Sequence, residues 1–225
     1  MFTKKRIEIN LNKNAKFSIY FATIIIFGIL VRFIFINKLP PALHFDEARN
    51  GLDAVKILSG EIKNLIKQPV LLGDKDPSKE ALYNNILAFS IKTFGQNETS
   101  LRITSAILSS ISLVMFLFLS KKIFRGDKKS QVIAITFYAF SSWNIIASRL
   151  VYRLNLIPLV TIGALFPLLA ILKSKKPSTL NYVLFGAINA IGIYTYSSYL
   201  VLFLFLYTTI FVFKLHKKVF YSILA

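Results

Sequence analysis

Two adjacent carboxylates, Asp46 and Glu47, lie just beyond the first long apolar run of the chain. An ionised carboxylate can serve as a general base when it lies within hydrogen-bond reach of a substrate hydroxyl. The same pair also suits the start of a helix, where Asp is a good N-cap and Glu in the first turn complements the helix dipole. The pair alone therefore has two interpretations, a helix cap and a catalytic base.

Helical spacing places Asp46 on one face with Asp53 and with either Arg49 or Asn50. A guanidinium group close to a carboxylate favours its ionised form, so Arg49 is a candidate to orient Asp46 and keep it charged. On this interpretation Asp53 is a residue of the helix face that supports Arg49.

Motifs for other chemistries are missing from the sequence. It has no Walker A or glycine-rich dinucleotide loop, no Ser-His-Asp order, and no His/Cys metal spacing, and it contains no Cys. One close carboxylate pair provides few of the oxygen ligands that Mg²⁺ or Mn²⁺ requires. We therefore expect neither a metal nor another cofactor, and the sequence argues against a nucleotide-powered pump.

The elements that must position the carboxylates are long apolar runs. The chain is 55% hydrophobic, with a mean hydropathy of +0.59, and a bilayer core needs about 20 helical residues. We predict an all-α integral membrane protein with about six transmembrane helices and a seventh, at 219–225, that stops short. The six runs cover residues 17–37, 99–120, 130–148, 156–172, 180–196 and 199–213.

Basic residues account for the net charge of +18 and occur at every second boundary of these runs. This alternation is typical of the positive-inside rule, so it favours membrane topology and contact with anionic lipids over nucleic-acid binding. It predicts a multi-pass protein of the cell membrane with a cytoplasmic tail at 1–16. The first run has no cleavage site after it, so we interpret it as a retained anchor. The basic clusters lie in residues 1–16, 121–129, 173–176 and 214–218.

A single large loop, residues 38–98, lies on the predicted external side and carries eight of the ten acids. Its first part predicts an amphipathic helix lying in the membrane interface, with Arg49, Asp53 and Lys56 opposite the apolar face. A second amphipathic segment is expected from Glu80 to Phe94. The apolar face of the first helix comprises Ala48, Leu52, Val55, Leu58, Ile62 and Leu65.

Several stretches together resemble a known family. They read "LPPALHFDEARNGLDAVKIL", "KEALYNNILAFSIKTFG", "SSWNIIASRLVYRLNLIPLV" and "GIYTYSSYL". From Phe17 onward the chain is similar to the N-terminal half of GT-C glycosyltransferases, in the branch of the protein O-mannosyltransferases and aminoarabinose-type lipid A transferases. Its most specific element is the Asp-Glu pair after the first span. The resemblance implies that 1–225 is the N-terminal part of a longer transmembrane domain, whose C-terminal part is missing.

The resemblance implies an enzyme that moves a sugar from a polyprenyl-phosphate carrier to a protein, lipid or glycan acceptor at the external membrane face. Asp46 would be the general base of an inverting transfer, with Glu47 beside it. Arg149 and Arg153 are candidates to stabilise the departing phosphate, because Arg matches phosphate geometry. They are equally interpretable as interfacial charges. Glu80 is a candidate for binding acceptor or sugar, or a solvated acid at a helix start.

Two points leave other functions open. Many relatives carry a further acid soon after the third span, whereas the segment "SRLVYRLNLIP" has none. A polytopic transporter or flippase for lipid-linked sugars is one alternative, although the span centres are nearly free of charge and no repeat is present. A non-catalytic membrane fragment or scaffold is the other. The concentration of acids outside the spans favours chemistry at the membrane surface.

Overall fold

The computed structural model of the chain describes residues 13–61 and 81–213, and all regular structure in these residues is helical. The all-α prediction is therefore confirmed for the described part of the chain. The elements in order are α1 Lys13–Phe33, α2 Phe45–Ser59, α3 Ala81–Phe94, α4 Glu98–Ile123, α5 Lys128–Phe140, α6 Ser142–Ala147, the 3₁₀ turn η2 Arg153–Asn155, α7 Leu156–Lys173, α8 Thr179–Ile193 and α9 Tyr199–Phe213.

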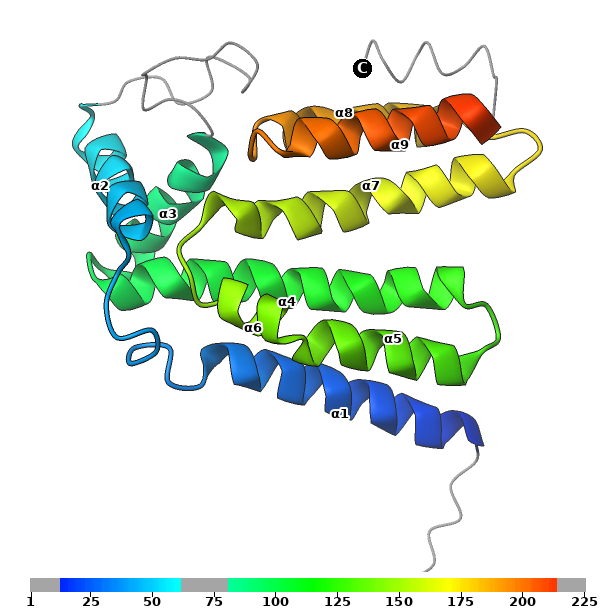
Figure 1. Ribbon diagram of the computed structural model, residues 1–225, viewed down its shortest axis with the longest axis horizontal. Coiled ribbons are helices and arrows are strands. Elements are labelled where there is room, and N and C mark those ends of the chain that lie inside the picture. The colour runs from blue at the N-terminus through cyan, green and yellow to red at the C-terminus, as the bar shows by residue number, and fades with distance from the viewer. Residues whose placement is uncertain (1–12, 62–80, 214–225) are drawn as a thin grey trace, which may run out of the picture.

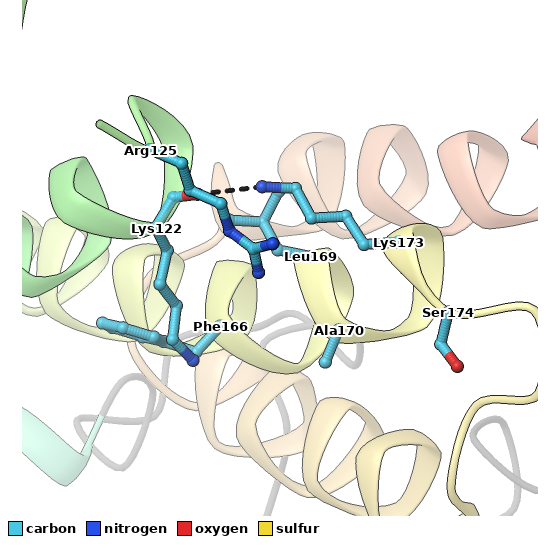
Figure 2. Close-up of a pocket in the computed structure, with 7 residues that line it drawn as sticks. All are labelled: Lys122, Arg125, Phe166, Leu169, Ala170, Lys173 and Ser174. Atoms are coloured by element: carbon cyan, nitrogen blue, oxygen red, sulfur yellow. Dashed lines mark hydrogen bonds between the residues drawn. The ribbon is translucent and has the colours of Figure 1, made fainter. Parts of the chain in front are cut away.

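The long helices lie side by side in a stack, with α4 in contact with α1, α3, α5 and α7 (Figure 1). At one end, on the left of Figure 1, α2 and α3 pack against each other and against the start of α4. We call this the α2–α3 end. The opposite end, called the basic end, holds the start of α1 and the α4–α5 and α7–α8 connections, with Lys122, Arg125 and Lys173 (Figure 2).

Three helical segments are long and apolar enough to cross a membrane: Ala15–Phe33, Glu98–Ile123 and Arg153–Lys173. They indicate a membrane protein. The shorter helices α8 and α9 are apolar but have 15 residues each. The span expected at 130–148 is interrupted, because Ser141 adopts φ −56°, ψ 125° and separates α5 from α6. The described residues thus show three of the six expected spans as long apolar helices, and the expected seventh, at 219–225, lies outside them.

The first span ends earlier than predicted. Helix α1 stops at Phe33, well before Pro40 and Pro41. Phe35 then adopts the left-handed conformation with φ 55°, and its carbonyl accepts from the backbone N–H groups of Lys38 and Leu39 at 2.9 Å each. A local turn rather than the prolines therefore ends the helix.

Helix α4 is apolar overall and lies centrally in the stack, but one of its faces is rich in Ser and Thr. Its buried face carries small hydroxyl residues, and several of these donate to carbonyls of the preceding turn, such as Ser110 to Ala106 at 2.7 Å and Ser112 to Leu108 at 3.0 Å. Small side chains allow neighbouring helices to approach closely in a membrane. Because these hydroxyls donate to carbonyls of α4 itself, they need no hydrogen-bond partner from another helix.

Candidate functional site

The carboxylate pair lies at the start of α2, but Asp46 is not the helix cap. His44 occupies the N-cap position, and the helix begins at Phe45. The Glu47 carboxylate accepts from the His44 backbone N–H at 2.8 Å, which is half of a capping box. The N-cap interpretation of Asp46 was therefore wrong, because Glu47 performs the capping. Asp46 is exposed in the first turn, whereas Glu47 is completely buried.

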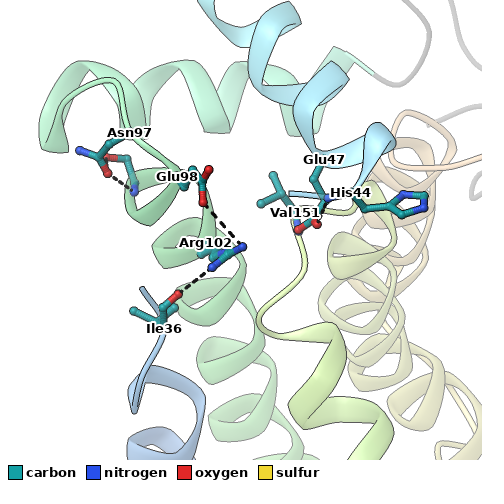
Figure 3. A network of polar contacts seen from close by, with 8 residues as sticks. Ile36, His44, Glu47, Asn97, Glu98, Arg102 and Val151 are labelled. Atoms are coloured by element: carbon teal, nitrogen blue, oxygen red, sulfur yellow. Dashed lines mark hydrogen bonds and ion pairs between the residues drawn. The ribbon is translucent and has the colours of Figure 1, made fainter. Parts of the chain in front are cut away.

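Glu47 and Asn50 together satisfy the backbone of Val151, which is buried in irregular chain before η2. Glu47 Oε1 accepts from the Val151 N–H at 2.8 Å (Figure 3). Asn50 Nδ2 donates to the Val151 carbonyl at 2.8 Å. Buried backbone groups outside regular structure need such partners. Two side chains one helical turn apart therefore fasten α2 to the segment that leads into α7.

Arg153 is the second link between these segments. Its Nε donates to Asn50 Oδ1 at 2.9 Å, and its guanidinium lies 3.7 Å from the Asp53 carboxylate. Asn84 of α3 donates to the same carboxylate at 3.4 Å. Asp53 thus pairs with Arg153 and not, as expected, with Arg49. It is also buried, not on a solvated face, since its exposed fraction is 5%.

The burial of the polar side of α2 was not predicted. Its packed face carries Glu47, Asn50 and Asp53, while Leu52 is 62% exposed on the opposite side. Gly51 lies on the packed face, where an added Cβ would be 2.8 Å from a methyl group of Leu101 in α4. Helix α2 therefore turns its polar side to the protein and an apolar side outward.

Tyr83 of α3 lies beneath this polar cluster and is completely buried. Its hydroxyl is 2.7 Å from Ser105 Oγ of α4. Burial raises the pKa of Tyr83 far above its ordinary value, although hydrogen bonds to Ser105 and Asn155 act in the opposite direction. The phenol is therefore a neutral hydrogen-bonding group that ties α3 to α4 under the site.

Tyr152 lies close enough to Asp46 and Glu47 for both carboxylates to act on its phenol. Burial raises the pKa of the Tyr152 phenol, and the carboxylates of Glu47 and Asp46 raise it further. The rings of His44 and Tyr152 meet edge to face, with centroids 6.5 Å apart. Arg49 is exposed, and no ion pair to Asp46 is recorded within 13–61 and 81–213. Asp46 thus lies within electrostatic reach of the Tyr152 phenol, whose ring in turn contacts the His44 ring.

Two further arginines, Arg149 and Arg102, contact the last turn of α1 and the turn that follows it. Arg149 donates to the Val31 carbonyl at 2.7 Å, and its buried Nε has no hydrogen-bond partner. Arg102, 1% exposed, donates to the Ile36 carbonyl at 3.2 Å and lies 3.9 Å from the Glu98 carboxylate (Figure 3). Its Nε and one terminal nitrogen also lack hydrogen bonds. Arg149 therefore contacts α1, whereas Arg153 contacts α2.

Arg32, in the last turn of α1, is buried between three helices. Its Nε donates to Ser109 Oγ of α4 at 2.9 Å. One terminal nitrogen donates to the carbonyls of Gly28 at 2.6 Å and Ala139 at 3.1 Å. These contacts join α1 to α4 and α5.

Sequence reasoning missed Tyr83 and Asn84 as members of the site. For α2, the useful signal was the three-residue spacing of Glu47, Asn50 and Asp53, which marks a continuous polar stripe. Glu80, a predicted binding residue, lies outside the described residues. Within the described ranges, no group of three or more His, Cys, Asp or Glu side chains is arranged to hold a metal ion.

Comparison with known proteins leaves the family open. No protein-family model, curated protein or solved structure matches the chain. The fold and the site must therefore be interpreted from their own geometry.

Proposed function

We propose that the chain belongs to a membrane glycosyltransferase that takes a sugar from a polyprenyl-phosphate carrier, with Asp46 as the general base. The observation that carries this proposal is the contrast between two adjacent carboxylates. Glu47 is buried and engaged by two backbone N–H groups, whereas Asp46 is exposed on the same fixed helix turn. A rigidly held, accessible carboxylate meets the geometric need of a base.

In the proposed step, an Asp46 oxygen removes the proton of an acceptor hydroxyl. The acceptor oxygen forms a bond to the anomeric carbon while the bond from that carbon to the carrier phosphate breaks. The phosphate leaves with the electron pair, and the configuration inverts. A phosphate leaves as an anion without protonation, so its departure requires only cationic stabilisation.

The cations differ in how well they suit this role. Arg149 and Arg102 both donate to the segment 31–36 and both keep unbonded guanidinium nitrogens. Arg153 already holds Asn50 and Asp53. We therefore assign phosphate stabilisation to Arg149 with Arg102, and to Arg153 and Glu47 the positioning of α2. Arg49, exposed one turn after Asp46, is a candidate acceptor contact.

The membrane orientation is part of the proposal. The α2–α3 end would face the external side of the cell membrane and the N-terminus the cytoplasm, because the clusters at 121–129 and 173–176 lie at the opposite end of the stack. The acceptor, whether protein, lipid or glycan, would then meet Asp46 at the lipid–water boundary.

The test is transfer of radiolabelled sugar from a panel of polyprenyl-phosphate sugars, in membranes that contain the full chain. Asp46→Asn should lower the rate by about 100-fold or more, the contribution typical of a general base. Glu61→Gln is the matched control, since Glu61 is an exposed acid just after α2. If a folded Asp46→Asn variant transfers sugar at the wild-type rate, Asp46 is not the general base. If the wild type transfers no sugar from any donor of the panel, the proposed transferase activity is wrong.

A further inference from the structure

A second polar feature lies at the basic end, far from Asp46. A pocket of about 270 Å³ opens between the ends of α4 and α7 (Figure 2). Lys122, Arg125 and Lys173 supply its charge, and Phe166 and Leu169 supply an apolar wall. The volume is several times the roughly 30 Å³ that one water molecule occupies in the liquid, so the pocket suits a molecular group and not a single small ion.

Two of the three cations are held in place. Lys173 Nζ donates to the Lys122 carbonyl at 2.8 Å, which joins the end of α7 to the end of α4. Lys122 Nζ lies over the Phe166 ring, 5.0 Å from its centroid. Both helices end here, and helix C-termini favour cations. The pocket therefore has a partly preorganised cationic rim.

The rim has no neutralising acid in the described part of the chain. The recorded ion pairs there are those of Arg102 and Arg153 at the other end. The acid of the neighbouring loop, Asp127, caps α5 by accepting from the Ser130 N–H at 3.1 Å and from its hydroxyl. These hydrogen bonds lower the pKa of Asp127, so it stays ionised, but it does not line the pocket and, among the described residues, makes no recorded ion pair with Lys122, Arg125 or Lys173. The cations of the rim can therefore still bind an anion in the pocket.

The apolar wall decides which kind of anion fits. Phe166, Leu169 and Ala170 belong to α7, part of a segment long and apolar enough to cross a membrane. A ligand in the pocket therefore meets cations at its outer side and a lipid-facing helix on its inner side. We propose that this pocket binds the phosphate headgroup of an anionic phospholipid whose acyl chains run along α7. Basic pockets between membrane helices recognise lipid headgroups in this way.

The test uses the full chain in nanodiscs of phosphatidylcholine, with phosphatidylglycerol added in steps. The triple variant Lys122→Gln, Arg125→Gln, Lys173→Gln removes the rim. The matched control is Lys129→Gln, Lys175→Gln, Lys176→Gln, which removes the same charge from exposed lysines outside the pocket. Thermal unfolding in phosphatidylcholine alone checks that both variants fold, and bound phosphatidylglycerol is counted by native mass spectrometry.

We expect the wild type and the control to retain phosphatidylglycerol and to unfold at higher temperature as its fraction rises. The rim variant should bind about five-fold more weakly per charge removed, on the order of 100-fold in all. Equal weakening in both triple variants would show diffuse attraction and overturn the pocket. If inorganic phosphate stabilises the wild type in phosphatidylcholine as much as phosphatidylglycerol does, the ligand is a soluble anion and not a lipid. Equal retention of phosphatidylglycerol by the rim variant would also overturn the proposal.

Discussion

The carboxylate of Glu47 accepts a hydrogen bond of 2.8 Å from the backbone N–H of Val151, across 104 positions of sequence. Asn50 completes the pairing by donating to the Val151 carbonyl. Both polar groups of a buried, non-helical residue are thus satisfied by one helix. The position of α2, and with it the direction in which Asp46 points, depends on this contact.

Replacement of Glu47 by Ala should therefore destabilise the protein. It leaves the Val151 N–H buried without a partner, which costs about 1–3 kcal/mol. Unfolding of the purified protein in detergent micelles by denaturant measures the free energy. Asp46→Ala is the matched control, since Asp46 is exposed and its removal should change the free energy of unfolding by less than about 0.5 kcal/mol. Equal losses for the two variants would contradict the assigned roles.

The pair of Asp53 and Arg153 should show energetic coupling. Their side chains are 8% and 19% exposed at a separation of 3.7 Å, and contacts of this kind couple by about 0.5–3 kcal/mol in a double-mutant cycle. The cycle uses Asp53→Asn and Arg153→Gln with the free energy of unfolding as its measure.

A comparison cycle uses Glu98→Gln and Arg102→Gln. Glu98 is 57% exposed and 3.9 Å from Arg102, so solvent should reduce the coupling to about 1 kcal/mol or less. Additive effects at Asp53 and Arg153 would show that their proximity contributes nothing to stability.

Tyr83 should make stability sensitive to high pH. Burial raises its folded-state pKa above the ordinary value near 10. The folded state then keeps the proton that the unfolded state loses, so this contribution is fully present below about pH 10. It is lost progressively as the pH rises from there through the folded-state pKa.

Thermal unfolding midpoints recorded from pH 8 to pH 11 test this dependence. Tyr83→Phe should lower stability at pH 8 by about 1 kcal/mol, through the lost bond to Ser105. It should also make the decline at high pH less steep, while Tyr152, whose pKa is raised too, still contributes to that decline. Tyr20→Phe, at a 54% exposed position, retains Tyr83 and should keep the wild-type decline. A parallel decline in all three proteins would refute the assignment.

Gly192→Ala should disturb the packing of α8 on α9. A Cβ at this position would lie 2.0 Å from the Tyr199 ring. That ring is buried and fixed by a 2.9 Å bond from its hydroxyl to Asn189. Overpacking of this kind costs about 1–3 kcal/mol or more. Gly163→Ala is the control, because its nearest neighbours would be 3.6 Å away, and α7 should gain up to about 1 kcal/mol in helix propensity. Thermal unfolding distinguishes the two.

Length and composition were sufficient to predict the long spans, because an apolar segment of 20 residues needs little partner information to be recognised. They did not predict the break at Ser141, where neither Pro nor Gly marks the interruption. Hydropathy averages over such a local change of backbone, so it did not reveal that the helix expected at 130–148 is divided.

The burial of the polar side of α2 was not predicted, for a physical reason. The predicted interfacial helix turns its apolar residues away from the protein, and Leu52 does face outward. Periodicity does not say what the opposite side meets, and there Asn50 and Asp53 join buried polar partners. Periodicity identified the two faces of the helix, but only the positions of Val151 and Arg153 determine which one is covered. Those contacts join residues about 100 positions apart.

The contacts of Arg32 can form only after much of the chain has been synthesised. Its partners Ser109 and Ala139 are 77 and 107 positions further along the chain. When α1 leaves the ribosome, neither partner has been made. Arg32 lies in the last turn of α1, and long basic side chains near helix ends reach the interface, so its cost there is below that of an arginine at a helix centre. The final packing of α1 therefore waits for α4 and α5, and the three helices reach their mutual arrangement only after Ala139 has been made.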